Sequence, residues 1–260
     1  MRIGVYIDGY NLYYGGKREC GTTATTWKWF SPRRIAESSL NAQLQFATSQ
    51  GWTAITQAWT NAAVSRIVYC TARVDASQNP SGHADQDVYL KALKADLAVD
   101  HIEYGNYVAR TKVAPLAVKT PGKSSNSPPQ VVTSQWPVMI KDQFGNDVPN
   151  ATFMVSYLHN EEKGSDVNVA SHLLIDILDQ RIDGAMVISN DSDLKFPVAE
   201  ARRRIPVGVI NPSDRYTAAD LQPDHLPGAG IHWNRKLRAA DFTSNQLPDP
   251  AGRYHKPAGW

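Results

Sequence analysis

The sequence predicts an α/β fold in which a mostly parallel sheet is covered by helices on both faces. Three observations lead to this prediction. Short runs are β-branched and nearly all apolar, which is typical of strands buried on both faces. They alternate along the chain with segments whose apolar residues recur at helical spacing. The hydrophobic fraction, 42% of 260 residues, is large enough for a substantial core and excludes wholesale disorder.

Four elements of the first half support this prediction in turn. A strand opens the chain with Ile3, Val5 and Ile7 and ends at Asp8. Ser31 and Pro32 suit the N-cap and first position of a helix with an apolar stripe through Ala47. Residues 67–74 then predict a second strand, and residues 85–97 predict a helix with one apolar side.

The region after a third predicted strand, at residues 102–108, changes in character. Pro121-Gly122 and Pro128-Pro129 indicate loops, and residues 144–147 suit a turn between extended runs at 138–140 and 153–157. We therefore expect residues 109–152 to form a β-rich surface insertion, a hairpin with loops.

Regular alternation resumes after the insertion. We predict a helix at 165–178, a strand at 185–189, a helix after Asp193 with Pro197 in its first turn, and a strand at 207–210. These elements predict a main domain at residues 1–212. The remaining residues 213–260 are rich in Pro, His and Trp and are expected to be a C-terminal extension that packs on the domain or trails it.

Charge and cysteine content limit the classes of function. Lys and Arg number 27 against 25 Asp and Glu, so nucleic acid would have to bind at a local patch, since the net charge is only +2. Cys20 and Cys70 are too few for a disulfide framework and lack zinc-ligand spacing. Without a signal-peptide pattern or a long apolar window, the sequence predicts a cytoplasmic protein with no membrane contact.

Acidic residues gather where the predicted strands end. Asp8 closes the first strand, and Asp191 and Asp193 follow a later one. Asp166 lies near a helix start and shares its face with apolar residues, whereas Asp176 lies about 80° away and is expected to face solvent. Because ligands bind beyond the carboxyl ends of parallel strands, we predict a functional site at this edge of the sheet.

Four converging carboxylates would repel one another unless a cation lay between them. Oxygen ligands favour Mg²⁺ or Mn²⁺, and such an ion suits metal-assisted hydrolysis of a phosphodiester. Taken singly, Asp193 and Asp166 are more simply explained as helix-capping and first-turn residues. The functional interpretation depends on their combination.

Three sequence blocks resemble the NYN domain family of PIN-like, Rossmann-like metal-dependent ribonucleases. They are residues 5–13 (VYIDGYNLY), 161–170 (EEKGSDVNVA) and 189–193 (SNDSD). The resemblance implies a Rossmann-like, three-layer nuclease domain and a divalent-metal-dependent endoribonuclease that binds Mg²⁺ or Mn²⁺. In that family's pattern, Asp8, Asp166, Asp191 and Asp193 match the metal-binding acids, and Asn11 matches a polar partner near the scissile phosphate. Asn190 and Leu194 depart from frequent Gly and Phe.

Further residues are candidates for RNA contact. Tyr13 and Tyr14, with Tyr10, are expected in an aromatic, basic loop on which unpaired bases of single-stranded RNA or RNA loops could stack, although ordinary loop packing explains them equally well. Lys163 could contact a phosphate. The basic runs 202–204 and 235–238 are weaker candidates, because charge runs usually face solvent. His225, His232 and His255 lack metal-ligand spacing and are expected to be structural or exposed.

Other functions fit the sequence less well. The residue two places after Asp8 is Tyr10, where a haloacid-dehalogenase phosphatase needs a second Asp, and neither GxGxxG nor GxSxG occurs in the chain. The main alternative is a non-catalytic RNA-binding or regulatory module of the same fold. The sequence leaves open the RNA target, a preference for RNA over DNA, the number of metal ions and the formation of a homo-oligomer.

Overall fold

The computed structural model describes residues 1–21, 26–118, 130–132, 139–223 and 230–260. They form two compact units, the first comprising Met1–Tyr107 and Glu162–Trp260 and the second Val108–Glu161. In the part of the chain that the structure describes, no helix is both long and apolar enough to cross a membrane.

The elements of the first unit are β1 (Arg2–Asp8), α1 (Gly9–Cys20), α2 (Pro32–Ser49), α3 (Thr53–Trp59), β2 (Ala63–Ala72), α4 (Pro80–Ala95), α5 (Ser165–Leu178), β7 (Gly184–Ile188), η1 (Ser192–Leu194), α6 (Lys195–Arg202), β8 (Val207–Asn211), η2 (Ala219–Leu221), β9 (Trp233–Lys236) and α7 (Ala239–Thr243). Strands β3 (His101–Pro115) and β6 (Met154–Lys163) run from this unit into the second, which also holds β4 (Ala117–Val118) and β5 (Gln130–Val131).

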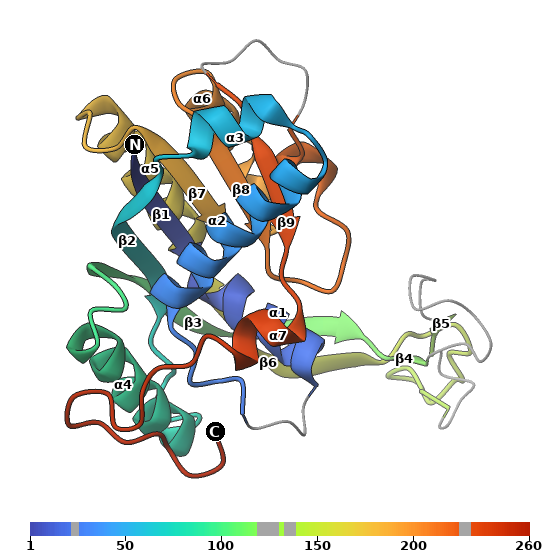
Figure 1. Ribbon diagram of the computed structural model, residues 1–260. Coiled ribbons are helices and arrows are strands. Elements are labelled where there is room, and N and C mark those ends of the chain that lie inside the picture. Colours follow the sequence, from blue (N-terminus) through green and yellow to red (C-terminus); the bar gives the residue numbers. More distant parts are fainter. Residues whose placement is uncertain (22–25, 119–129, 133–138, 224–229) are drawn as a thin grey trace. The chain divides into compact units, whose positions relative to one another are not determined.

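Seven of the described strands assemble into a sheet of order β6-β3-β2-β1-β7-β8-β9, with β1 at its centre (Figure 1). The pairs β1–β2, β1–β7, β2–β3, β7–β8 and β8–β9 are all parallel. This confirms the predicted α/β class with a mostly parallel sheet. The C-terminal β9 and α7, which the sequence pattern did not reveal, belong to the first unit.

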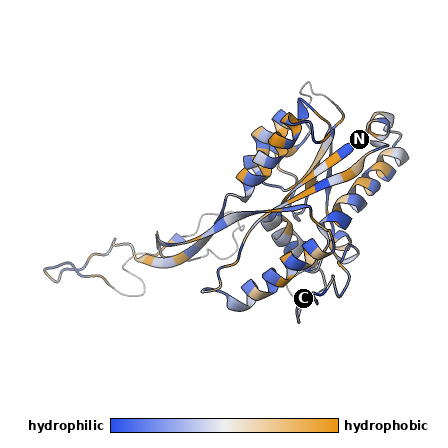
Figure 2. Cartoon of the chain, turned by 90° about the vertical axis from the view of Figure 1, so that its left-hand side faces the viewer, coloured by the Kyte–Doolittle hydropathy of each residue, from blue (hydrophilic) through white to orange (hydrophobic). Residues whose placement is uncertain are grey.

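Helices cover the two faces of the sheet through separate apolar clusters. On one face, the alternation of side chains along β1 places Ile3 and Ile7 in a cluster with residues of α2, α4 and α7, including Ile35. On the other, Tyr6 of β1 packs with Val169 and other residues of α5 and α6. Figure 2 shows the matching concentration of apolar residues along the strands and on one side of the helices. Consecutive residues of β1 therefore pack against helices on opposite faces of the sheet.

Helix α1 corrects the prediction of an aromatic, basic loop at Tyr10, Tyr13 and Tyr14, because all three residues lie in a helix. Two glycines lower the helix propensity of this segment and hide the element in the sequence. Their small size is required by tertiary packing: a Cβ at Gly15 would overlap the backbone of Pro212, and one at Gly16 would lie 2.7 Å from the Trp27 ring.

The other predicted elements are found with shifted ends. Ser31 caps α2 by accepting a hydrogen bond from the Arg34 amide at 3.4 Å, and Pro197 lies in the first turn of α6. In the second unit, β4 pairs with β5 in an antiparallel manner. An antiparallel bridge between Lys141 and Asp147 encloses the predicted turn, where Gly145 has φ +83°. The predicted loops within 121–129, Val138 and His225 lie outside the described residues.

Two predictions about surface charge are wrong. Asp176 is a residue of α5 that was expected to face solvent. Its side chain is instead fully buried between α5 and the sheet. It accepts hydrogen bonds from the Tyr6 hydroxyl at 2.9 Å, Arg66 Nε at 2.7 Å and Arg181 Nη1 at 3.1 Å. Arg202, expected in a basic surface patch, is also buried and donates to two consecutive backbone carbonyls at the end of η2. Helical periodicity cannot reveal such partners, because they come from distant segments.

Replacement of the buried carboxylate in Asp176→Ala should lower the free energy of unfolding by about 3 kcal/mol, because two arginines and Tyr6 lose their shared acceptor. Urea unfolding monitored by circular dichroism measures this change. The matched control is Asp179→Ala, which removes an ion pair of Arg181 whose carboxylate side is 49% exposed, and should cost less than about 1 kcal/mol. Equal losses in the two variants would contradict the structural role of Asp176.

Candidate functional site

Asp8 occupies the junction between the central strand β1 and helix α1. Its carboxylate caps α1 by accepting hydrogen bonds from the Asn11 backbone amide and from Asn11 Nδ2, each at 2.9 Å. Ser189, at the end of β7, donates its hydroxyl to the same carboxylate at 3.3 Å. The structure thus brings Asp8 and Asn11 together as predicted, and the side chain of Asn11 orients Asp8.

Burial changes the protonation of Asp8. The side chain is only 4% exposed, and this desolvation raises the pKa of Asp8 to about 6, although the hydrogen bonds from Asn11 and Ser189 oppose the rise. The charge of Glu162 raises the pKa further. A carboxyl group with such a pKa exchanges a proton close to neutral pH.

Glu103 and Glu162 extend this acidic region along the sheet. Asp8 is the register partner of Cys70, which is in turn the partner of Glu103, so these three side chains lie in one row on the same face. Glu162, at the end of β6, contacts Ser165 and lies against Gly105 of β3. Burial, followed by the charges of Asp8, Glu103 and Glu162, raises the pKa of the Cys70 thiol. We call Asp8, Glu103 and Glu162 the acid row.

Sequence patterns alone did not select Glu103 or Glu162. Glu162 lies within the second NYN-like block, where the family's pattern matches Asp166 instead, and Glu103 lies inside a predicted strand. One sequence signal indicates Glu103 as a site residue: strand alternation directs this acid to a buried side of the strand, where acids are unusual.

The other predicted acids lie at the starts of η1 and α5. The Asp191 carboxylate accepts a hydrogen bond from the Asp193 amide at 3.0 Å and caps η1, while Asp193 itself is exposed. Asp166 is partly buried in the first turn of α5, and Lys163 is exposed just before it. The sequence suggested Asp193 as a helix-capping residue. In the structure the capping residue is Asp191 instead.

Possible metal-ligand atoms come together within the part of the chain that the structure describes. There, a set of three or more His, Cys, Asp or Glu ligand atoms within 4.8 Å of one another occurs at His101, Glu103 and His172. The carboxylates of Asp8, Asp166, Asp191 and Asp193 form no such set among these same residues. Their assignment to Mg²⁺ or Mn²⁺ stays a prediction.

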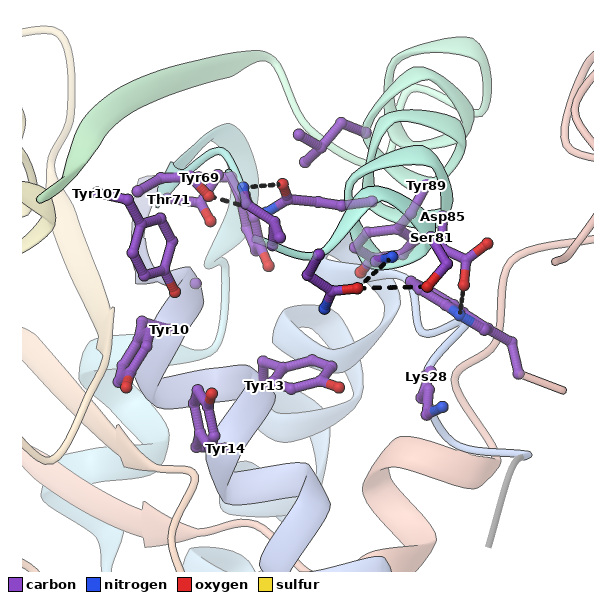
Figure 3. Close-up of a pocket in the computed structure, with 18 residues that line it drawn as sticks. Tyr10, Tyr13, Tyr14, Lys28, Tyr69, Thr71, Ser81, Asp85, Tyr89 and Tyr107 are labelled. Carbon is purple, nitrogen blue, oxygen red and sulfur yellow. Dashed lines mark hydrogen bonds between the residues drawn. The ribbon is translucent and has the colours of Figure 1, made fainter. Parts of the chain in front are cut away.

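A cavity of about 330 Å³ opens beside α1, within the first unit, and its lining includes Tyr69, Thr71 and Ala72 from the end of β2. Seven of its 18 lining residues are aromatic, and Figure 3 shows tyrosines of α1, β2, α4 and β3 around it. The aromatic residues are Tyr10, Tyr13, Tyr14, Tyr69, Tyr89, Tyr107 and Trp260. We call this space the tyrosine cavity.

The rings of the tyrosine cavity support one another. Tyr14 lies 4.4 Å from Tyr10 and 5.3 Å from Tyr13, measured between ring centroids, and Tyr13 lies 5.3 Å from the buried Trp27. Desolvation raises the pKa values of Tyr10, Tyr13 and Tyr107. Their phenol groups therefore stay protonated and are able to donate hydrogen bonds at neutral pH.

Polar groups complete the lining of the tyrosine cavity on its α4 side. Asn79 caps α4, and Asp85 accepts a hydrogen bond from Trp260 Nε1 at 3.2 Å. Gln86 is held by backbone groups of the β2–α4 connection and its preceding strand. Lys28 supplies a cation whose Nζ lies 5.7 Å from the Trp260 ring centroid. The cavity thus combines flat aromatic walls with polar groups that cover a comparable share of its lining.

Comparisons with known proteins give a distant relative and a solved structure. The chain is 25% identical over 255 residues to the 6-hydroxy-3-succinoylpyridine 3-monooxygenase HspA of Pseudomonas putida, covering 95% of this chain and 70% of that protein. It is 14% identical, with a TM-score of 0.39, to a crystal structure of a protein of unknown function from Vibrio parahaemolyticus, covering 93% and 94% of the two chains. No family model matches the sequence.

The distant relative corrects the predicted enzyme class. It is named a monooxygenase, an oxidoreductase, and the match extends across almost the whole chain, so the prediction of a metal-dependent ribonuclease is wrong on this comparison. Resemblance to the NYN family and RNA as a partner stay predictions. The strand-end acids that suggested hydrolysis include Asp8 and Asp191, both of which cap helices.

The raised pKa of Asp8 predicts a pH-dependent loss of stability. Between an unfolded pKa of 3.8 and a folded pKa of about 6, the folded protein binds more protons than the unfolded chain, so its stability falls as pH rises through this window. A difference of about two pKa units corresponds to roughly 3 kcal/mol. Asp8→Asn should abolish this part of the dependence.

Chemical unfolding at pH 4, 5, 6 and 7, in the presence of a chelator, gives the free energy of unfolding of wild type and of Asp8→Asn. The quantity to compare across pH is the wild-type value minus the Asp8→Asn value. This difference should become more negative with rising pH. The exposed Glu37→Gln provides the control, and its difference from wild type should vary much less. A constant difference for Asp8→Asn would show that burial does not raise this pKa.

Proposed function

We propose that this chain binds a hydroxylated aromatic heterocycle with an acidic side chain in the tyrosine cavity and takes part in its monooxygenation. The observation that carries the proposal is the cavity itself, whose walls are tyrosines backed by Trp27 and closed by Trp260. Its volume of about 330 Å³ is at the small end of the range for ligand sites, which suits a single substituted ring.

Aromatic walls favour a flat ring as the ligand. Tyr10, Tyr14 and Tyr107 present their rings toward the cavity in Figure 3. Offset and edge-on contacts between aromatic rings contribute roughly 0.5–1.5 kcal/mol beyond area burial. A planar heterocycle would gain such contacts from several sides at once, whereas an aliphatic ligand would not.

Polar groups of the same cavity suit the substituents of such a ring. The phenols of Tyr10 and Tyr107 are protonated at neutral pH, as tyrosines ordinarily are, and are donors for a ring hydroxyl or its anion. Lys28 offers a positive charge for a carboxylate near Trp260. Ser81 lies on the opposite side of the cavity from α1 in Figure 3, and Asn79 also lines the cavity. Both supply neutral hydrogen-bonding groups.

The distant Pseudomonas relative supports the choice of ligand and reaction. Its name specifies a hydroxylated pyridine with a succinoyl substituent and a monooxygenase reaction. Such a molecule carries the flat ring, the hydroxyl and the carboxylate for which the tyrosine cavity has complementary groups. The proposal therefore joins a property of this cavity to the activity of a similar protein.

Removal of one ring wall tests the proposed binding site. Tyr10→Ala should weaken binding of 6-hydroxy-3-succinoylpyridine by about 3–10-fold, which is the loss expected for one aromatic contact. Calorimetric titration measures the dissociation constant. The control is Tyr216→Ala, because the Tyr216 side chain is 95% exposed and lies outside the cavity lining, and it should bind like wild type. Equal affinities of wild type and Tyr10→Ala would place the ligand elsewhere.

The reaction itself is checked by incubating the chain with the same compound, O₂ and a reduced nicotinamide as electron donor. When ¹⁸O₂ is used, mass spectrometry should detect a ring-hydroxylated product that carries ¹⁸O. Tyr10→Ala should slow its formation at low substrate concentration. Tight binding without any oxygenated product would limit the function of the cavity to binding.

Charge selectivity tests the role of Lys28. Lys28→Gln should weaken binding of 6-hydroxy-3-succinoylpyridine by about 10-fold, because a charge-assisted hydrogen bond is worth roughly 1.5–3 kcal/mol and Lys28 is only partly buried. Binding of 2-hydroxypyridine, which lacks the carboxylate, should be unchanged. Calorimetry with both compounds gives the two ratios, and a parallel loss for both would show that Lys28 acts through packing on Trp260.

A further inference from the structure

We propose that His101, Glu103 and His172 form a binding site for a divalent first-row transition-metal ion. His101 and Glu103 are two residues apart on β3, so strand alternation directs both side chains to the same face. His172 approaches that face from α5, whose neighbouring residues Val169 and Leu173 are packed in the core. Two rigid elements therefore bring the three side chains together.

The distances between the three side chains match those between ligands of one metal ion. His101 Nε2 lies 3.0 Å from Glu103 Oε2, and His172 Nε2 lies 3.1 Å from the same oxygen. Ligand atoms about 2.1 Å from a metal ion are about 3.0 Å apart at a right angle and about 3.4 Å apart at a tetrahedral angle. The two imidazole rings, with centroids 5.1 Å apart, are close enough to share the ion.

The donor set determines which ions fit. Two imidazole nitrogens and one carboxylate oxygen favour first-row transition metals such as Fe²⁺, Co²⁺ and Zn²⁺, whereas Mg²⁺ and Ca²⁺ prefer oxygen alone. Two histidines and one carboxylate also leave further coordination positions for water or another ligand. This site therefore differs in chemistry from the Mg²⁺ or Mn²⁺ site predicted at Asp8 and the other strand-end acids.

Solvent access allows an ion to reach the site. The side chains of His101, Glu103 and His172 are 42%, 39% and 22% exposed, so an ion can enter without any opening of the fold. The single formal negative charge of Glu103 attracts a cation. Without metal, both imidazoles can instead donate to Glu103, and this hydrogen-bonded arrangement already holds the ligands close together.

Metal titration of the tag-free, chelator-treated full chain tests the proposal. Zn²⁺ binding by calorimetry and Co²⁺ binding by visible absorption should both give one tight site. His172→Ala should weaken that site by about 100-fold or more, since even loss of a group that only orients a metal ligand costs 10–100-fold. Circular dichroism checks that the variant is folded, and Glu103→Gln gives a second, nearly isosteric test.

Matched controls make the result specific. His255→Ala removes an exposed histidine whose ring is 77% exposed, and should keep the affinity of wild type. Asp8→Asn and Tyr10→Ala should also keep it, which separates this site from the predicted acidic site and from the proposed function of the tyrosine cavity. Millimolar Mg²⁺ should not displace Co²⁺. The proposal is overturned if wild type binds no Co²⁺ or Zn²⁺, if Mg²⁺ displaces them, or if His172→Ala and Glu103→Gln bind as tightly as wild type.

Discussion

The hydrogen bonds of the buried Asp8 carboxylate join the central strand β1 to helix α1 and to the end of β7, and the α1 wall of the tyrosine cavity depends on this arrangement. Asp8 ends the central strand β1, caps α1 through Asn11 and accepts a hydrogen bond from Ser189 of the adjacent strand end. The start of α1 is thereby fixed relative to the sheet, and the tyrosines of its first turns are directed toward the cavity. Its desolvation cost is offset by these hydrogen bonds, since a buried carboxylate without partners would be strongly unfavourable.

Strand alternation separates the tyrosine cavity from the acid row while keeping them in the same unit. Tyr69 and Cys70 are consecutive on β2, yet Tyr69 lines the tyrosine cavity, whereas Cys70 is the register partner of Asp8 and Glu103 in the acid row. The metal-ligand group His101, Glu103 and His172 shares the face of Cys70. A parallel sheet thus provides two distinct surfaces for chemistry, and a shift of one residue in register would exchange them.

The acids at strand ends explain why the sequence favoured a nuclease. Carboxylates at such positions are suited to holding cations, but they are equally suited to capping the helix that follows each strand. Asp8 and Asp191 both perform this capping role. The same pattern therefore fits two different functions. In the function proposed above, the substrate binds in the tyrosine cavity and not at these acids.

By itself, the sequence determined the α/β class, the buried central strands, the helix at Ser165–Leu178 and the position of Asp8 at a strand end, because period and burial pattern are local properties. Tertiary structure alone decided the environment of Asp176, the helical state of the tyrosine segment and the meeting of His101 with His172. These features depend on contacts between segments far apart in the chain, such as Tyr6 and Asp176, which are 170 residues apart. No local pattern encodes which distant side chain will fill the space beside a given residue.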